Sequence, residues 1–352
     1  MGTALAPWLI SSFVFAGILM TLLASPLVKK TGLRPAVVIA AALAISGSGI
    51  GAFLHQPLLL VISRMLEGAG FGIICVAGPL IIEARIPVNH RGLANGIWGI
   101  WLPAGAFIGE VVAPTIYASP LGFAGLWLTL ALPLLPLLLI VLVTLGSKTK
   151  LAEEQREPTP RKRGFGELGI GFALFLVAWL SFNILNFALM SYGPSYMQET
   201  GMSASLSGLV TTIPMLLSLV TGPIGGVILD RFGHPKAMLL AALTVNGIAT
   251  ILLFTTTGIM LWAAAILLGL FGTITFVATL STIPQVLKNS AAYPTALSLY
   301  MFTQCGGELM ASVISPMVLG ESLNSWTVFA VFLGVCGAIG LGCAAAAKFR
   351  NR

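Results

Sequence analysis

The feature that most constrains this chain is a series of eleven apolar runs, each long enough to cross a membrane as a helix. A bilayer core of about 30 Å needs roughly 20 apolar residues in a helix. The runs cover roughly residues 8–28, 35–54, 58–82, 93–117, 122–145, 168–190, 204–229, 235–255, 258–287, 291–318 and 325–347. The sequence therefore predicts an all-α integral membrane protein with eleven transmembrane helices.

The composition agrees with this prediction and excludes other classes. Only 8% of the residues are charged and 57% are hydrophobic, whereas soluble domains carry about 25% charged residues. The net charge of +7 does not indicate nucleic-acid binding, because nearly all basic residues stand in short gaps between apolar runs. The four cysteines lie inside apolar runs without metal or redox spacing, so we expect neither a metal nor another cofactor.

Lys and Arg predict the orientation in the membrane. Of the 18 basic residues, 17 fall on one side when the runs are threaded back and forth, and Arg64 lies within a run. The 17 are Lys29, Lys30, Arg34, Arg85, Arg91, Lys148, Lys150, Arg156, Arg161, Lys162, Arg163, Arg231, Lys236, Lys288, Lys348, Arg350 and Arg352. We expect this side to be cytoplasmic, with the N-terminus outside, in a plasma membrane such as the bacterial inner membrane.

An internal repeat relates the two ends of the chain. Gly32 and Gly233 are 201 positions apart in similar turns, and Gly68 and Gly269 share the same offset. The five runs before residue 146 then correspond to the last five, and run 168–190 has no upstream partner. We expect an ancestral plan of six plus six helices that lacks its first helix here, with Met1 as an internal methionine of a longer protein. A true eleven-helix variant is the alternative.

The turn after run 204–229 resembles the signature of the major facilitator superfamily of secondary transporters. The family pattern G-x-x-x-D-R-x-G-x-x-R/K is matched by Gly226, Asp230, Arg231, Gly233 and Lys236. In the first half, Ser25 and Lys29 replace the Gly and the Asp. The segment from Arg64 through Glu67 to Gly70 is similar to the family's R-x-x-Q-G-x-G.

This resemblance implies two pseudo-symmetric helical halves around a central cavity. The halves would comprise residues 1–145 and 168–347, joined by a cytoplasmic loop at 146–167 and followed by a tail at 348–352. It also implies a small-molecule substrate, a coupling proton or ion, and a bilayer as surroundings. We expect a monomer.

Asp230 stands at the C-terminal end of its helix, where the helix dipole disfavours a negative charge. We expect it to contact the N-terminus of helix 93–117, through Arg91 or the neighbouring backbone N–H groups, and so to close the cytoplasmic side. The equivalent residue Lys29 would face the N-terminus of helix 291–318, where the dipole disfavours a cation. The alternative is a solvated turn in a cluster of positive charges.

Ionisable residues at membrane depth are costly and mark functional sites. The candidates are Arg64, Glu67, Glu110 and Glu308. Arg64 and Glu67 share a helix face, so Arg64 could bind an anionic substrate while Glu67 carries a proton, or the two could form a structural ion pair. Glu110 and Glu308 could exchange protons, or each could be a neutral acid bonded to nearby backbone.

Uncharged polar and aromatic residues complete the candidate site. Asn183 and Asn186 share a face of helix 168–190, and Trp98, Trp101 and Tyr300 could stack on a substrate. The alternative for the aromatic residues is packing between helices.

The sequence predicts secondary active transport of a small solute, coupled to protons or another ion. Arg64 favours an organic or inorganic anion, whereas two tryptophans and few charges would also suit efflux of a hydrophobic drug. A membrane enzyme is not expected, because the three histidines form no pair and no nucleophile, metal or phosphate-binding pattern occurs. A fragment without transport activity is a further alternative.

Overall fold

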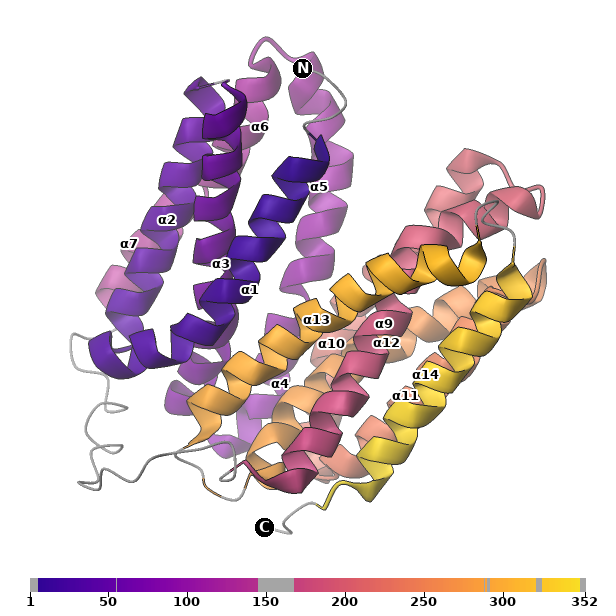
Figure 1. Cartoon of the computed structure of the whole chain (residues 1–352). Helices are drawn as coiled ribbons and strands as arrows, with labels where there is room; N and C mark the ends of the chain where they lie inside the picture. Colours follow the sequence, from indigo (N-terminus) through magenta and orange to yellow (C-terminus); the bar gives the residue numbers. More distant parts are fainter. Residues whose placement is uncertain are drawn as a thin grey trace. The chain divides into compact units, whose positions relative to one another are not determined.

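The computed structural model describes residues 6–54, 56–144, 168–287, 289, 292–320 and 325–348. Every regular element in these ranges is helical (Figure 1). His55, Lys288, the predicted cytoplasmic loop with its six basic residues, and Arg350 and Arg352 lie outside the described residues. The all-α prediction is confirmed.

The helices follow the predicted apolar runs, except that the helix predicted at 168–190 continues to Glu199. Those before the predicted loop are α1 (Ala6–Thr31), α2 (Leu33–Phe53), α3 (Pro57–Arg85), η1 (Val88–His90), α4 (Arg91–Gly99), α5 (Trp101–Ala118), α6 (Gly122–Ala131) and α7 (Leu134–Thr144). Those after it are α9 (Gly169–Glu199), α10 (Ala204–Phe232), α11 (Pro235–Leu253), α12 (Ile259–Val286), α13 (Tyr293–Leu319) and α14 (Trp326–Ala346).

Two predicted helices are each divided into two. The run 93–117 is interrupted at Ile100, between α4 and α5, because the ring of Pro103 opposes the carbonyl of Gly99 one turn earlier. The run 122–145 is interrupted between α6 and α7 at Leu132 and Pro133 for the same reason.

Nine segments in the described part of the chain are long and apolar enough to cross a membrane. The remaining two predicted spans are α4–α5, which is divided, and α13, which carries polar residues such as Gln304 and Glu308. The predicted total of eleven crossings therefore stays a prediction.

Contacts between Cα atoms divide the chain into two compact units. The first contains α1, α2, α3, α6, α7, most of α5 and the residues Pro294–Phe302 of α13. The second contains α4, α9, α10, α11, α12, α14, the first residues of α5 and most of α13. The predicted division into sequential halves at the central loop stays a prediction.

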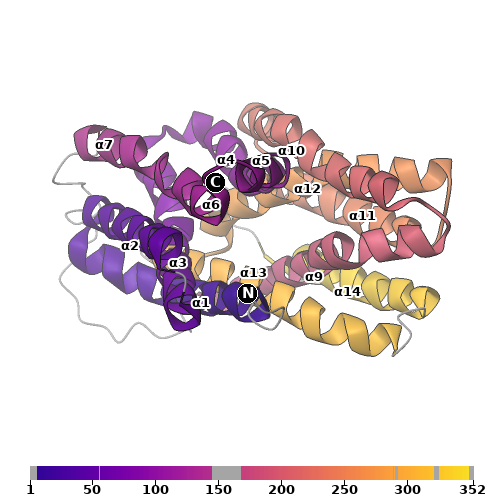
Figure 2. The ribbon, with the colours of Figure 1, turned by 90° about the horizontal axis from the view of Figure 1, so that it is seen from above.

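Within the first unit, α1 and α2 both pack along α3 (Figures 1 and 2). Glycine makes this approach close, since a Cβ on Gly68 would lie 2.1 Å from the carbonyl oxygen of Phe13. Within the second unit, α12 packs between α10 and α11, and α14 packs against α9 and α11. The core of this unit is aromatic at one end, where Tyr196, Phe254 and Trp326 contact one another.

Candidate functional site

The signature turn between α10 and α11 is a tight turn built on glycine. Gly233 takes the left-handed backbone conformation, with φ at 66°, and its N–H donates to the carbonyl of Leu229 at 2.8 Å. Only glycine adopts this conformation without strain, so α10 ends here. Asp230 thereby lies in the last turn of α10, as the sequence predicted.

Asp230 caps the N-terminus of α4. The N–H of Gly92 donates to Oδ1 of Asp230 at 2.7 Å, and the N–H of Leu93 donates to Oδ2 at 2.8 Å. These donors belong to the first turn of a helix, where backbone N–H groups have no partner within the helix and the dipole is positive. Of the two partners expected from the sequence, the backbone groups contact the carboxylate, while Arg91 Nε donates to the carbonyl of Ile86 at 2.9 Å.

Two pairs of glycines bring α4 and α10 together above this cap. A Cβ on Gly226 would lie 2.2 Å from the carbonyl oxygen of Gly92, and a Cβ on Gly96 would lie 2.3 Å from that of Gly222. The four-residue spacing on both helices places each pair on one face, in register with Asp230 one turn further on. We call the cap and these four glycines the α4–α10 latch.

The corresponding first-half contact is weaker. Lys29 Nζ donates to the hydroxyl of Thr295, in the first turn of α13, at 2.9 Å between exposed groups. Lys29 therefore lies at a helix N-terminus, where the dipole disfavours its charge, as the sequence predicted. The side chain of Arg231, the remaining residue of the signature, is exposed and lies 5.8 Å from the ring centre of Phe232.

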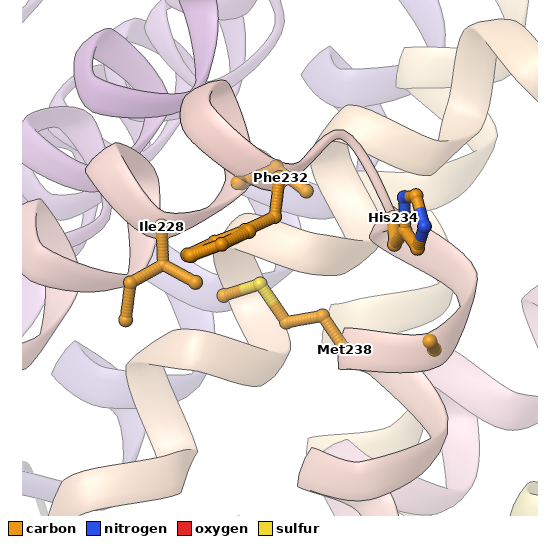
Figure 3. Close-up of a pocket in the computed structure, with 6 residues that line it drawn as sticks. Ile228, Phe232, His234 and Met238 are labelled. Atoms are coloured by element: carbon orange, nitrogen blue, oxygen red, sulfur yellow. The ribbon is translucent and has the colours of Figure 1, made fainter.

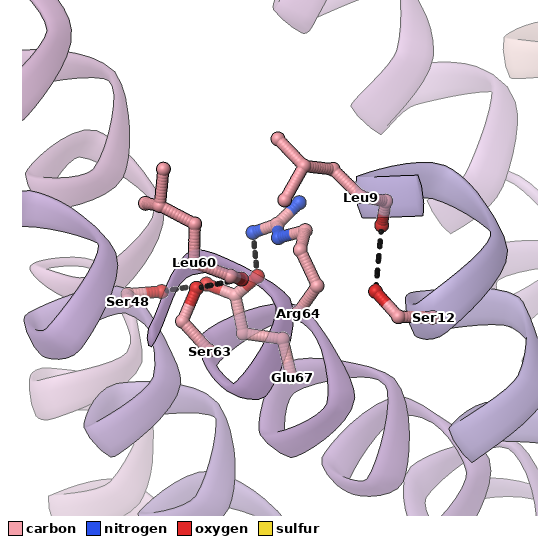
Figure 4. A network of polar contacts seen from close by, with 7 residues as sticks. All are labelled: Leu9, Ser12, Ser48, Leu60, Ser63, Arg64 and Glu67. Carbon is pink, nitrogen blue, oxygen red and sulfur yellow. Dashed lines mark hydrogen bonds and ion pairs between the residues drawn. The ribbon is translucent and has the colours of Figure 1, made fainter. Parts of the chain in front are cut away.

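Arg64 and Glu67 form an ion pair on α3 (Figure 4). The hydroxyl of Ser48 on α2 also donates to Glu67, which is only 7% exposed. The guanidinium of Arg64 lies 4.1 Å from the ring centre of Trp127 and 5.8 Å from that of Phe13, so it makes cation–π contacts on α6 and α1. This geometry matches the structural ion pair that the sequence left open.

The two asparagines of α9 do not act together. Asn183 is buried, and its amide donates to the carbonyl of Trp179 at 2.7 Å, one turn earlier. Asn186 is exposed. Residues three apart on a helix point in only roughly the same direction, and a neighbouring helix covers Asn183 but not Asn186.

The aromatic candidates also separate. Trp98 and Trp101 lie on either side of the break at Ile100, with ring centres 6.0 Å apart. The indole N–H of Trp98 is buried and has no acceptor among the described residues. Tyr300 is fully buried, so its ring has no free face in this structure.

Glu308 and Glu110 are the two acids predicted for outward-running helices. Glu308 on α13 is half-buried and accepts a hydrogen bond from the amide of Gln304 at 3.3 Å, one turn earlier. The backbone of Glu110 belongs to α5, but its side chain lies outside the described residues. Glu308 therefore has a neutral partner where Glu67 has a cation.

Sequence reasoning missed several residues that complete these sites. Trp127 stands in a uniformly apolar run, and Ser48 in a stretch of small residues, so neither carries a signal of its own. The pairing of Gly92 and Gly96 with Gly222 and Gly226 could have been found, because both helices repeat glycine at four-residue spacing.

A shallow apolar hollow lies beside the signature turn (Figure 3). It has a volume of about 220 Å³ and is lined by Ile228, Leu229, Phe232, His234, Ala237 and Met238. Its lining offers a single polar side chain, so it does not provide the polar contacts that orient a solute.

Comparison with known proteins identifies a family whose profile matches this sequence. The profile of the Major Facilitator Superfamily matches residues 2–208 and 172–352. H(+)/hexose cotransporter 2 of Parachlorella kessleri is 31% identical over 102 residues, 29% of this chain and 19% of that protein. The MFS-type efflux pump LUC4 of Fusarium sp is 26% identical over 215 residues, 60% of this chain and 35% of that protein.

Among solved structures, the E. coli fucose:proton symporter superposes with a TM-score of 0.75 and 18% identity, covering 98% of this chain and 91% of that one. At this identity the likeness concerns the fold alone. The aligned parts span only 19% and 35% of the two curated relatives. Since the family profile covers most of the sequence, the chain belongs to the Major Facilitator Superfamily.

Proposed function

We propose that the protein carries out secondary active transport of a small solute by alternating access, coupled to protons. The observation that carries this proposal is the α4–α10 latch, in which a carboxylate holds the N-terminus of another helix through two backbone N–H groups. Such a contact can open and close without covalent change. Membership of a transporter superfamily supports it.

The distribution of basic residues supports a membrane location and an orientation for the protein. We propose a multi-pass protein of the plasma membrane, the inner membrane in a bacterium, with the signature turns in the cytoplasm and the N-terminus outside. The bilayer and the solute are its partners, and no nucleic acid or cofactor is involved. The protein acts as a monomer.

Sugars are the solute class that we propose to test first. Trp98 and Trp101 offer aromatic rings, and the buried indole N–H of Trp98 is a donor available to a hydroxyl group. The hexose cotransporter supports this choice. The anion favoured by Arg64 on sequence alone comes second, because Glu67 already neutralises that guanidinium.

Efflux of a hydrophobic compound is the alternative direction of transport. The relative with the longest alignment among those compared above is named an efflux pump. Direction is decided by measuring both uptake and extrusion in the same vesicles.

Glu308 is the residue that we propose for proton coupling. Its side chain accepts a hydrogen bond from a neutral amide, so it can gain and lose a proton without leaving a buried cation unpaired. Glu67 would expose the charge of Arg64 on protonation, which is unfavourable in a low-dielectric interior.

The test uses the chain reconstituted in vesicles with an imposed pH gradient and a panel of labelled hexoses, small anions and lipophilic cations. We expect uptake of a hexose that collapses when the gradient is dissipated. Trp98→Phe, which keeps an aromatic ring and removes the donor, should raise KM. Glu308→Gln should abolish accumulation but keep exchange, with Glu199→Gln as the control at the end of α9. Accumulation by Glu308→Gln with unchanged pH dependence would refute the coupling role.

A further inference from the structure

The signature turns make a second contact that is the same in both units. In the first unit, a guanidinium N–H of Arg34 donates to the carbonyl of Leu142 at 2.9 Å. In the second, Lys236 Nζ donates to the carbonyls of Ala345 at 3.0 Å and Ala347 at 2.9 Å. Each basic residue stands in the first turn of the helix that follows the turn, and each reaches the C-terminal end of a different helix.

These contacts lie one position apart in the internal repeat. Arg34 and Lys236 are 202 positions apart, one more than Gly32 and Gly233, and α7 and α14 are the helices that close the two repeats. The turns also match in the backbone, because the N–H of Gly32 donates to Val28 and that of Gly233 donates to Leu229, both at 2.8 Å. The same contact at two places argues that it is a built feature of the repeat.

The physical basis is the end of a helix. The last carbonyls of a helix have no partner within it and carry the negative end of the dipole, so a cation there is favourable. The carbonyls of Ala345 and Ala347 lie at the end of α14, and Ala347 itself is fully buried. Lys236 therefore satisfies one acceptor in a buried residue, Ala347, and one in an exposed residue, Ala345.

We propose that Lys236 is a positioning residue of the α4–α10 latch, holding the α10–α11 turn against the end of α14. Asp230 precedes the turn and Lys236 follows it, so the turn is fixed on one side to α4 and on the other to α14. We call the contact of Lys236 with α14 the Lys236 brace, and the contact of Arg34 with α7 the Arg34 brace. The Lys236 brace keeps the carboxylate of Asp230 in position to accept from the N–H groups of Gly92 and Leu93. This proposal rests on the gating role given to the latch above.

The two units then differ in what their braces do. In the first unit the turn carries Lys29, whose exposed ammonium group donates to the hydroxyl of Thr295. The Arg34 brace therefore holds α2 against α7 without positioning a carboxylate. The Lys236 brace holds the same turn that Asp230 holds against α4. Loss of the two braces should affect local structure equally and the latch unequally.

The test measures two distances by spin labels in the full chain, with its native cysteines replaced. Labels at Val88 and His234, both exposed, report the latch, and labels at His234 and Ala346 report the brace. Lys236→Met should broaden the brace distance and raise the ratio of open to closed latch about two- to fivefold, the range expected for one charge at a helix end. Lys236→Arg should restore both distances, and Arg34→Met should change neither.

If Lys236→Met broadens the brace distance and leaves the latch distance as in the unchanged protein, Lys236 is merely structural and the proposal is wrong. An equal latch shift from Arg34→Met would also overturn it. Asp230→Asn distinguishes failure of the proposed gating function from failure of the role given to Lys236. If this substitution leaves the latch distance unchanged, the gating function is wrong. The brace distance then still tests the contact of Lys236 with α14.

Discussion

The substitution Asp230→Asn tests the latch most directly. Hydrogen bonds to a charged acceptor contribute roughly 1.5–3 kcal/mol each, and Asp230 accepts two. Asn keeps one oxygen but turns its own N–H groups toward the second backbone donor, so it retains about 1 kcal/mol from one neutral bond. The expected loss is at least about 2 kcal/mol, a factor of about 30 in the equilibrium between closed and open latch.

Hydrogen–deuterium exchange measures this loss of latch stability at the two backbone amides that donate to Asp230. The amides of Gly92 and Leu93 are protected only while they donate to Asp230, because they lie in the first turn of α4. We expect their exchange in Asp230→Asn to accelerate about 30-fold, and the amides of Ala249 and Thr250, deep in α11, to keep their rate.

Lys29→Ala is the matched control at the equivalent position. The hydrogen bond from Lys29 to Thr295 joins exposed groups and is opposed by the dipole of α13, so it contributes less than about 0.5 kcal/mol. Exchange at the N-terminus of α13 should therefore change by less than about threefold. Equal acceleration by the two substitutions, or unchanged exchange of Gly92 and Leu93 in Asp230→Asn, would refute the one-sided latch.

Further predictions concern packing and the ion pair. Gly226→Ala should open the latch as strongly as Asp230→Asn in the same exchange assay, because its Cβ would meet the backbone of α4 at 2.2 Å, whereas Gly105→Ala, with no atom within 4 Å, should be tolerated. Arg64→Met alone should lower the thermal midpoint in detergent more than the double change Arg64→Met with Glu67→Leu, because the single variant leaves a buried carboxylate unpaired at a cost of about 3 kcal/mol. A double variant that is less stable than the single one would contradict the structural role of the pair.

The fold was predictable because its strongest determinant is local. Each long apolar run became helical, and the last residue of α10 and the first residue of α11 follow from Gly233 and Pro235. The two breaks were missed although their cause is visible in the sequence. Pro103 and Pro133 each remove a backbone donor inside an apolar run, and hydropathy alone does not register that loss.

The contact of Asp230 was predictable for a different reason. A carboxylate at a helix C-terminus is unfavourable where it stands, so it needs a positive partner, and the nearest helix N-terminus supplies one. No comparable argument identifies Trp127 as the partner of Arg64 or predicts that Tyr300 is fully buried. Aromatic residues suit lipid, packing and ligand contacts alike, so their roles depend on which helices meet.

The two signature turns show that the latch and the brace are separable parts of one motif. Lys29 stands where Asp230 stands in the repeat and cannot hold a helix N-terminus by charge, yet Arg34 makes the same contact with a helix end as Lys236 does. The brace needs only a cation near unpaired carbonyls, and either Arg or Lys provides it. The latch needs an anion whose two oxygens meet two adjacent N–H groups, which a cation cannot replace. We therefore expect a loss of about 2 kcal/mol at Asp230 alone to shift the equilibrium between closed and open latch about 30-fold.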